Sequence, residues 1–159
     1  MQISIELNLK TREVYQLFQR KISGDRLFIA AILNQFNRVM GQCRQQNQSA
    51  LVVFHQIEQS LFDLTQKFRE EMSRFEALLM TKENFTDINF HFVVQFRQSI
   101  SVCNVLGMRF VEFINTYDQL IATLKLLQLA EFFESVDAYF THIKRIQKSA
   151  NRVLSQIIT

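Results

Sequence analysis

The chain has no proline, no tryptophan, three glycines and two cysteines among its 159 residues. The absence of proline favours long helices, because a proline inside a helix removes a backbone donor and clashes with the preceding turn. Cys43 and Cys103 stand far apart without a CxxC pair or a neighbouring histidine, which argues against a disulfide framework or a metal site. These absences favour a mainly helical protein in a reduced compartment.

Motifs typical of enzymes and membrane proteins are also absent. The sequence has no phosphate-binding loop, nucleophile elbow, HExxH or dinucleotide fingerprint, and its three histidines stand apart from one another. No segment reaches the roughly 18 apolar residues that a membrane span requires. We therefore expect a cytoplasmic, soluble protein that is not an enzyme, has no cofactor or metal, and has neither a membrane nor a small-molecule substrate as its partner.

The residues that are present can bury a large core. Hydrophobic residues make up 48% of the chain, 16 of them are phenylalanine, and the formal net charge is +3. This composition excludes an intrinsically disordered chain. The charge is compatible with a polyanionic partner, although many proteins of similar charge bind none.

The first ten residues alternate between apolar and polar side chains. Ile3, Ile5, Leu7 and Leu9 fall on one side of this pattern, which predicts a β-strand with one buried and one exposed face. The polar face consists of Gln2, Ser4, Glu6, Asn8 and Lys10. A strand at a chain terminus presents unpaired backbone groups, so it must find a partner strand.

Helical spacing dominates the rest of the chain. We expect helices over residues 11–23, capped by Thr11, over 25–40, capped by Asp25, over 53–81, over 101–127, capped by Ser101, and from about 134 onward. Residues 41–49 are polar and predict a loop. Residues 87–97 alternate through Ile88, Phe90, Phe92, Val94 and Phe96, which predicts a second strand.

The predicted fold class is therefore mainly α with a minor β component. An N-terminal strand-helix-helix segment, residues 1–41, precedes a bundle of long helices with a second short strand, residues 42–159. We expect the two segments to form one compact unit. The last helix carries Ile143, Ala150 and Ile157 in a heptad rhythm and so predicts a partner helix.

The last helix also carries four cations on the face opposite its heptad stripe. Lys144, Arg145, Lys148 and Arg152 are spaced so that they share this face. Such a face can bind phosphates, but basic stripes of this kind also serve solubility. The sequence leaves both interpretations open.

The order strand, helix, turn, helix resembles the ribbon-helix-helix regulators, and "KISGDRLFIAAI" resembles the turn of that family at Ser23, Gly24 and Asp25. The resemblance implies a two-stranded ribbon, made by two chains, whose polar face reads bases in the major groove. The base-reading candidates are then Gln2, Ser4, Glu6, Asn8 and Lys10. The phosphate-binding candidates are Thr11, Arg12, Arg20, Lys21, Ser23, Gly24 and Arg26.

A second resemblance covers most of the chain, to a family of proteins from integrating conjugative elements and conjugative plasmids. It lies in "LNLKTREVYQLF", "SALVVFHQIEQSL" and "FINTYDQLIATLKLLQL", and in their order. The resemblance implies a transcriptional regulator, an activator of conjugative transfer genes, similar to the AcaB-type ribbon-helix-helix regulators. Its implied partners are double-stranded DNA and a second copy of the chain.

The strand at residues 2–10 has two possible partners, and the function depends on which is right. Pairing with the same strand of a second chain favours a DNA-reading dimer. Pairing with residues 87–97 of the same chain favours a helical interaction or assembly protein of a conjugation or secretion system. In that second interpretation the exposed apolar face of the last helix is the functional surface.

Overall fold

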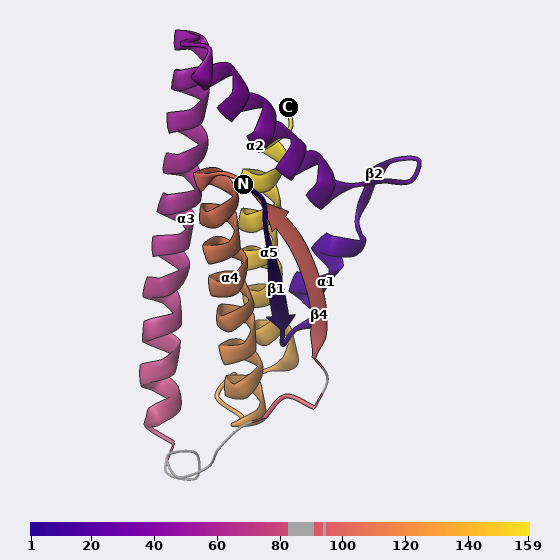
Figure 1. Ribbon diagram of the computed structural model, residues 1–159. Coiled ribbons are helices and arrows are strands. Elements are labelled where there is room, and N and C mark those ends of the chain that lie inside the picture. The colour runs from indigo at the N-terminus through magenta and orange to yellow at the C-terminus, as the bar shows by residue number, and fades with distance from the viewer. Residues whose placement is uncertain (83–90, 94) are drawn as a thin grey trace.

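The computed structural model of the chain describes residues 1–82, 91–93 and 95–159. These residues form five helices and two small antiparallel sheets (Figure 1). In chain order the elements are β1 (Ile3–Leu9), α1 (Arg12–Gln19), β2 (Lys21–Ser23), β3 (Arg26–Leu27), α2 (Phe28–Arg44), α3 (Gln48–Met80), β4 (Phe96–Val102), α4 (Val105–Leu129) and α5 (Val136–Ile157). The prediction of a mainly α protein with a minor β component is confirmed.

Helix α4 forms the centre of the molecule. It is apolar around most of its circumference, as expected of a helix that is covered on several sides. Helices α3 and α5 and strand β1 all contact it. Phe68 of α3 stacks on Phe113 of α4 with ring centroids 5.8 Å apart, and Tyr117 completes this aromatic cluster. The predicted partner helix for α5 is therefore found within the same chain.

Strand β1 pairs with β4 in antiparallel register, from Ile3 opposite Val102 to Leu9 opposite Phe96. The inner face of this ribbon buries Leu7 and Leu9 of β1 together with Ile100 and Val102 of β4. The predicted N-terminal strand is confirmed. Its partner belongs to the same chain, so the prediction that β1 forms its ribbon with a second chain is wrong for this edge of the strand.

The second strand lies further along the chain than predicted. Residues 91–93 are not in a strand, and β4 begins at Phe96 and extends to Val102. Residues 87–90 and 94 of the predicted strand, with Ile88, Phe90 and Val94, lie outside the described residues. The predicted helix cap, Ser101, lies instead in β4, and Asn104 caps α4 by accepting a hydrogen bond from the Gly107 N–H at 2.9 Å.

A small hairpin takes the place of the predicted turn between the first two helices, α1 and α2, which are both present. Helix α1 ends at Gln19, and β2 pairs with β3 around Gly24, which has a φ of 54°. The N–H of Phe28 donates to the carbonyl of Arg20 at 2.8 Å, which closes the hairpin at the start of α2. Asp25 therefore does not cap α2, because Leu27 holds that position.

The polar stretch at residues 41–49 is mostly helical. Helix α2 continues to Arg44, and α3 begins at Gln48 with Asn47 as its cap, since the Asn47 side chain accepts a hydrogen bond from the Ala50 N–H. The long helix predicted over 53–81 is confirmed and starts earlier. Within the described residues, no helix is both long and apolar enough to cross a membrane.

Candidate nucleic-acid interface

The outer face of the β1–β4 ribbon is polar along its length. The five predicted base-reading residues, Gln2, Ser4, Glu6, Asn8 and Lys10, are all exposed. Strand β4 adds three exposed side chains, because Ser4 lies opposite Ser101, Glu6 opposite Ser99 and Asn8 opposite Arg97. The sequence did not predict Ser99 and Ser101 as residues of this face, because Ser101 also fits a helix cap. Alternation of Ser99 and Ser101 with Ile100 and Val102 was the pattern that could have identified them.

The junction between β1 and α1 is held by a buried carboxylate. Asp118 of α4 accepts hydrogen bonds from the Lys10 N–H at 2.8 Å, from the Thr11 N–H at 3.0 Å and from the Thr11 hydroxyl at 2.7 Å. Burial raises the pKa of Asp118 above its usual value, although these hydrogen bonds act in the opposite direction. Thr11 is 1% exposed, so its predicted contact with a phosphate is wrong.

The other predicted phosphate-binding residues are exposed. Arg12 begins α1, and Lys21, Ser23, Gly24 and Arg26 belong to the β2–β3 hairpin. The Lys21 ammonium lies 3.5 Å from the Asp25 carboxylate, and both side chains are open to solvent, so this ion pair is weak.

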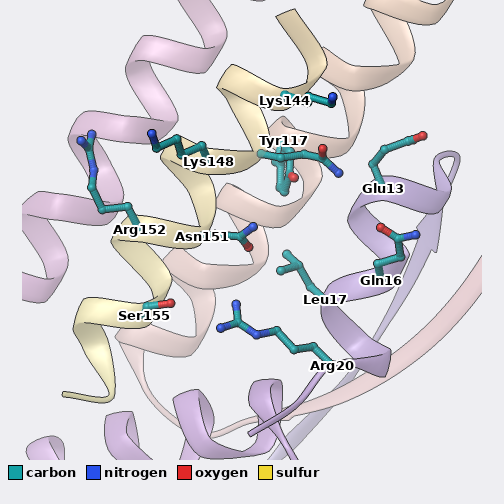
Figure 2. Close-up of a pocket in the computed structure, with 11 residues that line it drawn as sticks. Glu13, Gln16, Leu17, Arg20, Tyr117, Lys144, Lys148, Asn151, Arg152 and Ser155 are labelled. Carbon is teal, nitrogen blue, oxygen red and sulfur yellow. The ribbon is translucent and has the colours of Figure 1, made fainter. Parts of the chain in front are cut away.

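Arg20 follows α1 and is held in place by an aromatic ring. Its guanidinium lies 4.2 Å from the centroid of the Phe28 ring, in a cation–π contact. Arg20 also lines a cleft between α1 and α5 (Figure 2). Among the predicted phosphate-binding residues, Arg20 therefore lines the cleft, whereas Lys21, Ser23, Gly24 and Arg26 belong to the hairpin.

The cleft between α1 and α5 has a volume of 770 Å³ and is open to solvent. Its α5 wall carries Lys144, Lys148 and Arg152, three of the four cations of the predicted basic face. The fourth, Arg145, contacts the buried Glu71 carboxylate of α3 at 2.6 Å and so leaves this face. We call Arg20, Lys144, Lys148 and Arg152 the cleft cations.

The side chains of the cleft differ in direction. In Figure 2 Arg20 and Lys144 extend over the cleft from its two walls, whereas Lys148 and Arg152, which line the cleft at α5, direct their charged ends away from α1. Glu13 lies on the α1 wall, and the Lys125 ammonium is 2.9 Å from its carboxylate. Because Lys125 neutralises Glu13, the cleft has a positive charge.

Comparison with known proteins gives one match in structure. No protein-family model and no curated protein matches the sequence. The fold matches the crystal structure of AcaB from uropathogenic E. coli with a TM-score of 0.64 and 15% identity, over 99% of this chain and 77% of AcaB. The chain folds like AcaB.

The likeness to AcaB covers both surfaces described above. Since 99% of the chain is included, the β1–β4 ribbon and the helices of the cleft all lie within the shared fold. The resemblance to AcaB-type proteins that the sequence suggested therefore agrees with the structure at the level of the fold.

The described residues include no cluster of metal-binding side chains. They contain no group of three or more histidine, cysteine, aspartate or glutamate side chains that could hold a metal ion. His142 contacts Arg145 and the rings of Phe75 and Phe133, and its pKa is lowered, mainly by burial. These contacts place His142 in the packing between α3 and α5.

Proposed function

We propose that this protein is a non-enzymatic, DNA-binding transcriptional regulator of conjugative transfer genes, and that the outer face of its β1–β4 ribbon reads base edges in the major groove. The observation that carries the proposal is the uniformly polar outer face of a two-stranded antiparallel ribbon. The resemblance of the sequence to regulators of conjugation and the AcaB-like fold support it.

The dimensions of the ribbon suit the groove. Two strands lie about 4.8 Å apart, and the major groove is about 12 Å wide and admits a two-stranded ribbon. The chain forms this ribbon by itself, so base reading does not require a second copy. This changes the predicted mechanism, in which two chains shared the ribbon.

The side chains of the outer face match the donors and acceptors of base edges. Gln2 and Asn8 carry amides that can pair with adenine, and Lys10 and Arg97 are donors suited to guanine. Glu6 can accept from the amino group of cytosine. Arg12 begins α1 shortly after β1 ends, and in this proposal it contacts the backbone phosphates.

The predicted homodimer is part of the proposal. Within the described residues β1 is hydrogen-bonded to one strand, β4, so its other edge can accept the same strand of a second copy. A dimer would present two ribbons and favour a palindromic site. Sedimentation equilibrium of the full chain measures this directly, and a monomer at all concentrations contradicts it.

Selection of duplexes from a random library by the purified protein tests the reading of bases. We expect an enriched sequence that the variant Asn8→Ala/Arg97→Ala binds more weakly, by about 1–3 kcal/mol for each base that its side chains no longer reach. The matched control is Gln42→Ala/Arg44→Ala, which removes the same kinds of side chain from exposed positions of α2. Equal binding by both variants overturns the proposal for the ribbon.

The second candidate function is a helical interaction or assembly protein of a conjugation or secretion system. The pairing of β1 with β4 within one chain favours it, because the ribbon is then a structural element of the monomer. If no duplex binds in a salt-dependent manner, this second function replaces the first.

A further inference from the structure

The cleft cations have no carboxylate partner among the described residues, whereas four other cations of α3, α4 and α5 do. Arg69, Arg109, Lys125 and Arg145 all contact glutamates. Among the described residues, Lys144, Lys148 and Arg152 have no ion pair, and all three are exposed. Their charge is therefore available to an anionic partner.

The spacing of these three cations suits an extended anion. They follow one another at four-residue intervals on α5, which places them about 6 Å apart and spreads them over about 12 Å. One strand of duplex DNA carries a phosphate about every 3.4 Å along the axis, so this row spans roughly three phosphates. Arg20, on the opposite wall, adds a fourth cation.

Neutral polar groups fill the space between the cations. Gln16, Gln147, Asn151 and Ser155 line the same cleft and can donate hydrogen bonds to phosphate oxygens. Tyr117 is 1% exposed, so it offers no ring for a base to stack on. This combination favours contact with a sugar-phosphate backbone over the reading of bases.

The cleft and the ribbon are separate surfaces of the molecule. Strand β1 and helix α5 both contact α4, and in Figure 1 β1 lies beside α4 and in front of α5, so the outer face of the ribbon points away from α5. Within the described part of the chain, no residue of β1 or β4 lines the cleft. A straight duplex seated on the ribbon therefore does not reach the cleft. A phosphate backbone in the cleft must come from a second duplex segment.

We propose that the α1–α5 cleft is a second DNA site, which binds the phosphate backbone without sequence preference and lets the protein hold two duplex segments at once. The proposal rests on the proposed function for its first segment. The cleft itself makes a separate prediction, because its binding depends on cations that do not belong to the ribbon.

Two variants of equal charge change test the cleft. The cleft variant is Lys144→Gln/Lys148→Gln/Arg152→Gln, and the control is Arg44→Gln/Lys67→Gln/Arg74→Gln, whose residues are exposed on α2 and α3. Each is made in the wild-type chain and together with Asn8→Ala/Arg97→Ala. In the ribbon-variant background we expect the cleft variant to bind an unrelated duplex about tenfold more weakly, with a salt slope lower by about 3. The control variant should keep both the affinity for the unrelated duplex and the salt slope.

A capture assay tests the second segment. A duplex enriched by selection is immobilised, saturated with protein and exposed to a labelled duplex of unrelated sequence. We expect wild type and control to retain the labelled duplex, and the cleft variant to bind the immobilised duplex but release the labelled one.

The outcomes separate the two proposals. Retention of the labelled duplex by the cleft variant, as by the control, overturns the cleft proposal and leaves the ribbon untouched. A different result is that the cleft variant fails to bind the immobilised duplex while the ribbon variant binds it normally. The cleft is then the primary DNA surface, and both the ribbon proposal and the two-segment arrangement are overturned. No salt-dependent binding by any protein overturns both proposals.

Discussion

Asp118 of α4 binds Thr11 through two hydrogen bonds, one from the backbone N–H and one from the hydroxyl, although 107 residues separate them in the chain. The same carboxylate accepts a bond from the Lys10 N–H. These three contacts fix the end of β1 and the start of α1 on the central helix. They hold the ribbon in place while leaving the Lys10 side chain exposed.

Replacement of Asp118 by asparagine should destabilise the fold. The amide keeps one oxygen, so at least one of the three donors is left without its acceptor in a buried site. We expect the free energy of unfolding in urea to fall by about 1–3 kcal/mol at neutral pH. Asp63→Asn, at an exposed position of α3, is the control and should change stability by less than about 0.5 kcal/mol. Equal losses of unfolding free energy for Asp118→Asn and Asp63→Asn would show that the Asp118 hydrogen bonds contribute little to stability.

The pH dependence of stability should report the raised pKa of Asp118. In the native state burial lifts this pKa above the usual 3.8, so between 3.8 and the native value the folded chain holds a proton that the unfolded chain has released. Stability contributed by Asp118 is then full below 3.8 and declines as pH rises through this window. The difference in unfolding free energy between wild type and Asp118→Asn should shrink with rising pH. A difference that grows with pH would indicate a lowered pKa.

Gly107 should not tolerate a side chain. A Cβ at this position would lie 2.7 Å from Cγ1 of Val102, at the point where β4 turns into α4. We expect Gly107→Ala to cost about 1–3 kcal/mol by thermal or urea unfolding, because this part of the core is closely packed. The double variant Gly107→Ala/Val102→Ala should be less destabilised than the sum of the two single changes predicts.

Gly41 provides the matched control for Gly107. It lies in α2, and no atom comes within 4 Å of a Cβ built there. Gly41→Ala should therefore stabilise the chain by about 0.5–1 kcal/mol, through the higher helix propensity of alanine. Destabilisation by both alanines would show that the clash with Val102 is not the cause.

The ion pair between Arg145 and Glu71 should contribute more to stability than the other charges of α5. The Glu71 side chain is 6% exposed, so removal of Arg145 leaves a buried carboxylate without its cation. Arg145 is partly exposed, so we expect a moderate decrease of about 1–3 kcal/mol in unfolding free energy for Arg145→Met. Lys144→Met, one residue earlier and exposed, should be close to neutral in unfolding experiments. A larger loss of unfolding free energy for Lys144→Met than for Arg145→Met would show that the ion pair with Glu71 is not the main stabilising interaction of these charges.

Local patterns in the sequence were sufficient to predict the types of most elements. The alternation from Ile3 to Leu9 identified β1, and the spacing of Ile57, Leu61, Leu64 and Phe68 identified α3, because one side of each element is buried against the same core. Where the pattern was short, the prediction was wrong. The helix predicted over 11–23 ends at Gln19, because the hydrogen bond from Phe28 to Arg20 stabilises a hairpin instead.

Predicted site residues were exposed where they lay on a regular polar face. The five positions of β1 follow from alternation alone. Thr11 was predicted to contact a phosphate but is buried, because its hydroxyl donates a hydrogen bond to Asp118. No local pattern in the sequence connects these two residues. In the same way Arg145 left the predicted basic face of α5 because of Glu71, which lies on another helix.

The amino-acid order therefore accounts for an N-terminal strand with a polar face, for long helices without proline, and for a row of cations on α5, since each depends on neighbouring residues. Folding in three dimensions paired β1 with β4, brought Arg20 of one wall and Lys144, Lys148 and Arg152 of the other wall to one cleft, and left the ribbon outside that cleft. These relationships join residues far apart in the chain, and packing around α4 determines them.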